Sequence, residues 1–460
     1  MSKKSKTLII TLGLLLLLGG GYYGATVYQR GKTVAASADY TPPPALGNLD
    51  SSAVESIEVP GLVLRRQDAL WQVASLDGKT PPTPVALDQG RIQGMLYSLA
   101  TVWAERVVDE EPEDLSAYGL DAPSSRTVVT DSAGNTAVYL VGSLTPFRTS
   151  YFVMQEGDAR VFAVNSFTVD RLRFSLNDIR DRTLFPSAEL QALTAMRIER
   201  PGTLIDIRPM PEDPPHHLLS TFSRLVMTSP YRLVRGVDSE ALQKLLEPLP
   251  GRQIEDFVDD SPSSLRPYGL DNPVRLFLDF GGQSIDLLIG NPAGAGHYAK
   301  LAGAQAVFTV GALEPVASAR PFALADKFAL LVGIDLVERL SVTGGESAIT
   351  ALLQGENDDA VFSLNGRRVE NRSFRNWYQT VIGLLFDAEI PESNFRPESP
   401  GTGEIVVEYL LRSGERVYIT LVPYNRDFYA LIQEGTTEFL IARTQVRRIF
   451  DTLTTLVYEE

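Results

Sequence analysis

Alternating apolar and polar residues recur at three places in the chain, each time around a turn that contains glycine. The stretches are VESIEVPGLVLRR from Val54, TAMRIERPGTLIDIRP from Thr194 and VERLSVTGGESAITALL from Val337. A period of two residues on both sides of a short turn is typical of a β-hairpin, because successive side chains of a strand point to opposite faces. The pattern therefore predicts three hairpins.

Each predicted hairpin is followed by apolar residues at spacings of three and four, which is the pattern of a helix with one buried face. Asp88, Asp238 and Asn371 stand where a side-chain oxygen would cap the first turn. We expect Trp103 and Trp377 to pack into the core from these helices. The predicted helices are 88–108, 237–257 and 371–390, with further helical patterns at 176–185, 322–331 and 444–459.

A second repeated motif, YGLDxP, ends at Pro123 and again at Pro273, 150 residues further along the chain. Its glycine can take a positive φ, its aspartate can bond a backbone N–H two residues on, and its proline holds the chain extended into the next strand. We interpret it as a structural turn, with a partner-binding surface as the alternative. The third repeat has SPGT at 399–402 instead and is the divergent member. The turn residues are Tyr118, Gly119, Leu120, Asp121 and Pro123 in the first copy and Tyr268, Gly269, Leu270, Asp271 and Pro273 in the second.

The N-terminus carries an uncharged stretch, LIITLGLLLLLGGGYYGATVY, from Leu8 to Tyr28. A helix of this length, at about 1.5 Å per residue, spans the hydrocarbon core of a bilayer. Lysines before it predict a single-pass protein of the cytoplasmic (inner) membrane, with its N-terminus inside and its bulk in the periplasm or extracytoplasmic space. Gly20 and Gly24 form a G-x-x-x-G pair that would let two such helices pack closely. The alternative is a signal peptide cleaved near residues 36–38.

Composition and charge narrow the functional classes. The formal net charge is −15 and there is no cysteine. An acidic protein gains no counterion release from nucleic acid, and the missing cysteines exclude disulfides, thiolate catalysis and Cys-ligated zinc.

His216 and His217 are adjacent on a Pro-rich segment, without the spacing of a helical metal site, so we expect a solvated loop. The acidic runs at 109–114 and 259–260 predict solvated edges. We predict no catalytic residue, no cofactor and no metal.

Together these patterns predict an α+β fold class. An N-terminal transmembrane helix is followed by three repeated modules, each a mainly antiparallel sheet with one or two packed helices. The predicted boundaries are 1–28 for the cytoplasmic tip and anchor, 29–50 for a linker, and 51–190, 191–332 and 333–460 for the modules.

The repeats resemble a bacterial family called domain of unknown function 4340. The resemblance is carried by YGLDxP, by a strand ending at Gly142 or Gly290, by a VF-x-V strand and by a following L-x-D-x-R-D-K-like pattern, in which Arg182 and Lys327 correspond to the lysine. It covers roughly residues 50–331 and reaches the third copy more weakly. The resemblance implies a membrane anchor and an association with ABC-type or gliding-motility-type transport systems. It implies no catalytic residue.

Two functional hypotheses follow. The first is a membrane-anchored extracytoplasmic accessory or scaffold protein, a non-catalytic subunit of an ABC-type transport or envelope complex whose partner is a membrane protein such as an ABC permease. The alternative is a periplasmic binding module for an envelope polymer or a small ligand. An enzyme would require several acidic residues to converge in one pocket. The oligomeric state stays open.

Overall fold

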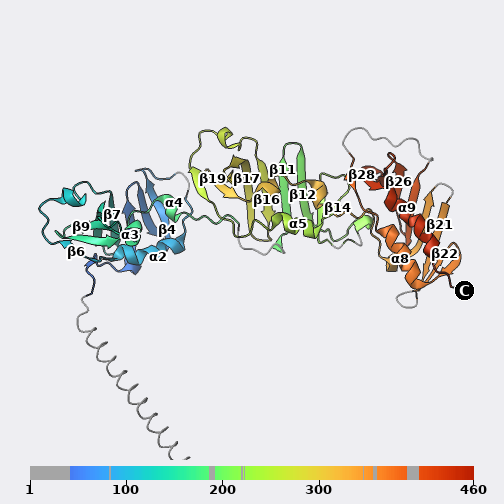
Figure 1. Cartoon of the computed structure of the whole chain (residues 1–460), viewed down its shortest axis with the longest axis horizontal. Coiled ribbons are helices and arrows are strands. Elements are labelled where there is room, and N and C mark those ends of the chain that lie inside the picture. Colours follow the sequence, from blue (N-terminus) through green and yellow to red (C-terminus); the bar gives the residue numbers. More distant parts are fainter. Residues whose placement is uncertain are drawn as a thin grey trace, which may run out of the picture. The chain divides into compact units, whose positions relative to one another are not determined.

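The computed structural model describes residues 42–81, 84–185, 192–218, 221, 223–344, 347–355, 360–390 and 403–459 (Figure 1). The chain divides into two compact units, Met1–Asp181 and Arg182–Glu460.

The first unit contains an antiparallel sheet of eight strands in the order β4-β3-β2-β7-β8-β9-β10-β6. Its strands are β2 Val54–Val59, β3 Leu62–Gln67, β4 Leu70–Leu76, β6 Arg106–Asp109, β7 Ser125–Asp131, β8 Thr136–Leu144, β9 Ser150–Gln155 and β10 Val161–Asn165. Its described helices are α2 Gln89–Ala100, α3 Ser166–Asp170 and α4 Leu176–Ile179, with 3-10 turns η1 Ser51–Ala53 and η2 Leu115–Tyr118. A small sheet pairs β1 Ala45–Leu46 with β5 Val102–Trp103, so the end of the predicted linker belongs to the fold.

The second unit contains two antiparallel sheets of nine strands each. The first consists of β11 Ala195–Arg200, β12 Thr203–Pro209, β13 Leu225–Ser229, β14 Arg235–Gly236, β15 Asp256–Asp259, β16 Val274–Asp279, β17 Ser284–Ala293, β18 Gly296–Leu301 and β19 Val307–Gly311. The next consists of β20 Val337–Gly344, β21 Ser347–Gln354, β22 Val361–Leu364, β23 Arg367–Val369, β24 Ala388–Glu389, β25 Ile405–Leu411, β26 Arg416–Pro423, β27 Phe428–Gln433 and β28 Thr436–Ala442. The described helices are α5 Ser239–Leu246, α6 Glu314–Ala317, α7 Pro321–Leu324, α8 Asn371–Ile382 and α9 Arg443–Asp451, with 3-10 turns η4 His216–Leu218, η5 Arg266–Tyr268, η6 Ile334–Leu336 and η8 Thr452–Thr455.

The three large sheets share one strand order. In each sheet the first strand of the predicted hairpin is β2, β11 or β20, and it pairs on one side with the second strand of the hairpin. On its other side it pairs with the first strand of a four-stranded meander, which is β7, β16 or β25. The last strand of the meander pairs with a short edge strand, β6, β15 or β24, that precedes it in the sequence. β14 and β23 extend the second and third sheets by one strand. We call the sheets with their helices the first, second and third modules.

The helices supply the apolar face that covers each sheet. In α2 the buried residues are Ile92, Leu96, Leu99 and Ala100, and most of them repeat at spacings of three and four. The first module has its own core cluster, whereas core residues of the second and third modules form one continuous cluster. The hydrophobic effect therefore joins the second and third modules into one unit.

The predicted fold class was wrong in its helical part. Each long predicted helix ends early, α2 at Ala100, α5 at Leu246 and α8 at Ile382, and the end of each predicted stretch enters a short edge strand, β6, β15 or β24. Local residues explain the stops, since α5 is followed by prolines in EPLPG and α8 by glycine. The predicted helical patterns at 176–185 and 322–331 shrink to single turns, α4 and α7. Trp103 lies in β5 and is 43% exposed, instead of packing into the core from a helix.

The transmembrane part of the predicted fold class also finds no support. Within the residues that the structure describes, no helix is long and apolar enough to cross a membrane. The predicted span from Leu8 to Tyr28, with its pair Gly20 and Gly24, lies outside those residues, as does the SPGT segment at 399–402.

Candidate functional site

The YGLD motif closes a short 3-10 helix onto the sheet in both copies. In the first copy the Asp114 side chain caps η2 by accepting from Ser116 N at 2.8 Å. Gly119 then takes a left-handed conformation, with φ 66°, and Leu120 N donates to Leu115 O at 3.0 Å. In the second copy the corresponding glycine has φ 69°. The predicted role of glycine in the turn is confirmed, because only glycine adopts this conformation without strain.

A second glycine receives each turn on the neighbouring strand. A Cβ on Gly142 would lie 2.2 Å from Tyr118 O, and a Cβ on Gly290 would lie 2.1 Å from Tyr268 O. The backbone of the turn therefore lies directly on β8 or β17. Leu120, 3% exposed, packs over the same glycine. This contact explains why the strand pattern ends in glycine in both copies.

An aspartate from the acidic run holds the tyrosine of each turn. Tyr118 Oη donates to Asp109 Oδ2 at 2.7 Å, and Tyr268 Oη donates to Asp259 Oδ2 at 2.9 Å. This hydrogen bond raises the pKa of each phenol. The acidic runs were predicted to be solvated edges only. The signal that was missed is the identical spacing, since the aspartate precedes the tyrosine by nine residues in both copies.

The aspartate of the motif does not make the predicted hydrogen bond. Asp121 and Asp271 are exposed, and the residue two positions on is Pro123 or Pro273, which has no backbone N–H to donate. Pro123 and Pro273 are half-buried and lead into β7 and β16. The turn is therefore held by its tyrosine, glycine and leucine, and it leaves one free carboxylate at the surface of each copy.

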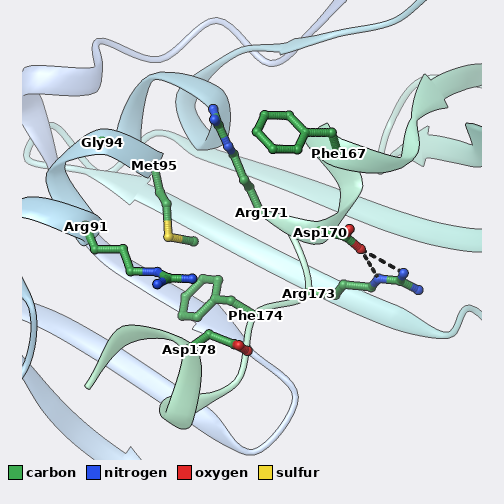
Figure 2. Close-up of a pocket in the computed structure, with 9 residues that line it drawn as sticks. All are labelled: Arg91, Gly94, Met95, Phe167, Asp170, Arg171, Arg173, Phe174 and Asp178. Carbon is green, nitrogen blue, oxygen red and sulfur yellow. Dashed lines mark hydrogen bonds and ion pairs between the residues drawn. The ribbon is translucent and has the colours of Figure 1, made fainter. Parts of the chain in front are cut away.

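The first module also contains an open groove between α2 and the segment that runs from α3 to α4. Its volume is about 620 Å³. Figure 2 shows Arg91 and Met95 reaching in from α2, with the remaining side chains coming from the other wall. The residues that line it are Arg91, Gly94, Met95, Phe167, Asp170, Arg171, Arg173, Phe174 and Asp178.

Two guanidinium groups of the groove have no carboxylate partner among the described residues. Arg173 pairs with Asp170 at 2.8 Å (Figure 2). It also donates to Tyr151 Oη at 2.8 Å. Arg171 instead donates to the neutral Ser98 Oγ at 2.6 Å and stacks on Phe167, 4.6 Å from the ring centroid. Arg91 uses its backbone N–H to close the α2 cap, and its side chain is exposed. No single sequence motif indicates this groove, because residues some eighty positions apart form it.

A buried polar cluster joins the second module to the third. Arg235 in β14 is 4% exposed, and its Nη1 donates to Gln433 Oε1 at 2.6 Å. Its guanidinium lies over the rings of Phe386 and Phe439, and Glu438 Oε2 lies 3.7 Å from Nη2. Burial lowers the pKa of Arg235. These contacts join the edge of one sheet to the β27–β28 hairpin of the next.

One histidine of the pair, His217, lies at the same junction between the second and third modules. His217 was predicted to lie on a solvated loop, which is wrong, because its side chain is 3% exposed. Its Nδ1 lies 2.9 Å from Glu434 Oε1 and its Nε2 lies 2.9 Å from Val234 O. His216 is half-exposed and lies 3.2 Å from Glu415. Within the described part of the chain, no cluster of three or more His, Asp or Glu side chains could hold a metal ion.

Comparison with known families identifies the repeats. Residues 78–273 and residues 226–379 each match a family model described as Domain of unknown function (DUF4340), and together the matches extend over more than half of the chain. The chain belongs to the DUF4340 family. The resemblance inferred from YGLDxP is thereby confirmed. The first DUF4340 match includes both YGLD turns, and the second begins at β13 and ends within α8. No curated protein and no solved structure matches the chain.

Proposed function

We propose that this DUF4340 protein is a non-catalytic accessory or scaffold subunit of an ABC-type transport or envelope complex, working on the extracytoplasmic side of the cytoplasmic membrane. The observation that carries the proposal is the threefold repetition of one sheet module. Proteins built from repeated modules commonly serve as extended binding surfaces. A membrane protein such as an ABC permease is the partner that fits this role.

The chemistry of the repeated turn supports a structural role for the repeats. Among the carboxylates around the first turn, Asp109 and Asp114 accept hydrogen bonds from protein groups, Tyr118 Oη and Ser116 N. A catalytic group would instead be aimed at a space where a substrate can lie. The repeated polar residues thus serve to hold the turn on the sheet.

Support for the transport context comes from the resemblance to a family often associated with ABC-type systems. The acidic character of the chain, with a net charge of −15, argues against nucleic acid as the partner. A protein partner is compatible with this charge.

Cross-linking in native membranes tests the proposal. The full chain with an affinity tag is expressed at its natural level, cross-linked briefly, and purified in parallel with an unrelated tagged membrane protein. We expect a transport-system protein to be enriched in the first sample and absent from the control. Purification with no membrane protein enriched over the control would contradict the proposal.

A further inference from the structure

At the equivalent positions of the other two modules, described side chains pack where the groove of the first module is open. Equivalent positions can be counted from the helix N-caps, Asp88 in α2 and Glu370 in α8, because each cap accepts from the backbone N–H three residues on. Met95 then corresponds to Trp377. That tryptophan is 1% exposed and donates from Nε1 to Ile449 O in α9 at 3.0 Å. In the third module a large side chain thus fills the space between the helices that the first module leaves open.

The second module differs at the same positions. Counting from its cap Asp238, Ala241 stands at the position of Arg91, and Leu245 packs on the core at the position of Met95. Its short helices α6 and α7 both pack against α5. The cationic groove is therefore a property of the first module and not of the repeated fold.

Glycine inside α2 keeps one wall of the groove flat. Gly94 lies in the middle of the helix, where glycine lowers stability relative to alanine. A Cβ on Gly94 would have no atom within 4 Å, so packing within the described protein does not require glycine here. The missing side chain leaves room for a ligand to approach the α2 backbone between Arg91 and Ser98.

The charge and exposure of the side chains that line the groove indicate which class of ligand it would bind. Arg91 and Arg171 have no carboxylate partner among the described residues, although the chain as a whole carries a net charge of −15. The two carboxylates that also line the groove are engaged, since Asp170 pairs with Arg173 and Asp178 accepts from Ser175. Phe167 is 67% exposed beside Arg171, and Met95 lies on the opposite wall (Figure 2). Guanidinium groups favour carboxylates, and an exposed phenylalanine beside them favours an apolar neighbour.

We propose that this groove binds an acidic peptide segment of a partner protein, in which carboxylate side chains meet Arg91 and Arg171 and an apolar side chain contacts Phe167 and Met95. This partner is the membrane protein that the proposed accessory or scaffold subunit would bind, so the inference rests on the proposed function. The open sides of the groove suit an extended segment that continues beyond it.

Peptide selection tests the inference directly. Random peptides displayed on phage are selected on the purified full chain, and the recovered peptides are synthesised with a fluorescent label. We expect sequences rich in Asp and Glu beside Leu or Phe, and binding that weakens as salt rises. The double variant Arg91→Ala/Arg171→Ala should bind them about tenfold more weakly or worse. The control Arg126→Ala, an exposed arginine of the same module paired with Glu156, should bind like wild type.

A second variant separates loss of the groove from loss of folding. Gly94→Leu fills the groove, should leave the circular dichroism unchanged and the thermal transition no lower than that of wild type, and should abolish binding. Selected peptides without acidic residues, or equal affinity for wild type and the double variant, would overturn the inference. So would phosphatidylglycerol vesicles or small organic anions that bind through Arg91 and Arg171 when acidic peptides do not. If the double variant still cross-links to the transport partner in membranes, the groove proposal fails while the scaffold proposal stands.

Discussion

At the scale of single residues, the contact between the YGLD turn and the sheet depends on the absence of a side chain. The backbone of the turn occupies the position that a Cβ on Gly142 or Gly290 would take. Because the opposing atom is a backbone carbonyl oxygen, it cannot rotate away as a flexible side chain could. The turn and the strand would have to separate.

We therefore expect Gly142→Ala and Gly290→Ala each to lower the free energy of unfolding by about 1–3 kcal/mol. Urea denaturation of the full chain measures the change. The matched control is Gly282→Ala, where an added Cβ would have no atom within 4 Å. Equal stability of Gly142→Ala and Gly282→Ala would show that the turn does not lie on the strand as described.

The tyrosines of the turns predict a dependence on alkaline pH. The hydrogen bonds to Asp109 and Asp259 raise the pKa of Tyr118 and Tyr268 above the ordinary value of 10.0, so the folded state holds these protons more tightly than the unfolded state. This stabilisation is complete below about pH 10 and is lost as the pH rises through the raised pKa.

The double variant Tyr118→Phe/Tyr268→Phe tests whether this stabilisation is lost at alkaline pH. It should be less stable than wild type at pH 8, and the difference should shrink as the pH rises above about 10. Denaturation at a series of pH values measures it. A difference that stays constant through this range would mean that the hydrogen bonds to the aspartates do not contribute.

At the scale of elements, the second and third modules are joined where β14 meets the β27–β28 hairpin. Arg235 is the central residue of that contact, with Gln433, Glu438 and two aromatic rings around it. Removing a buried charge from such a cluster leaves polar groups in an apolar space without their partner.

Arg235→Ala should lower the stability of the second unit by about 3 kcal/mol. The control Arg275→Ala removes an exposed arginine of the same module, paired with Asp286 at 2.6 Å, and should cost less than about 1 kcal/mol. The fluorescence of Trp377 reports unfolding of the second unit, measured in a Trp71→Phe/Trp103→Phe background. Similar losses in both variants would contradict the buried role of Arg235.

Local pattern predicted strands better than it predicted helices. The hairpins β2–β3, β11–β12 and β20–β21 lie where alternation of apolar residues indicated them, because that alternation follows directly from one buried sheet face. The helices were predicted too long, because the edge strands that follow them are also apolar and short. Contacts between distant residues could not be predicted at all. Arg171 and Ser98 in the groove, and His217 and Glu434 at the junction, meet only because the sheets bring their segments together.

At the scale of the whole molecule, the two largest hydrophobic clusters of the described residues predict two unfolding transitions. The core of the first module contains Trp71, and the continuous core of the second and third modules contains Trp377. Because the second and third modules share one core, they should unfold together. Calorimetry of the full chain should therefore resolve two transitions, and Trp377→Phe should remove the fluorescence signal of one of them. A single transition seen by every probe would contradict the division into two units.

We infer that this DUF4340 protein acts as a subunit of a membrane complex. Native mass spectrometry of the tagged full chain, gently extracted from its own membranes, measures this most directly. We expect a particle heavier than the chain by the mass of an identifiable transport-system protein, in a fixed ratio of subunits. A chain that is found only by itself, or only with further copies of itself, would contradict the claim.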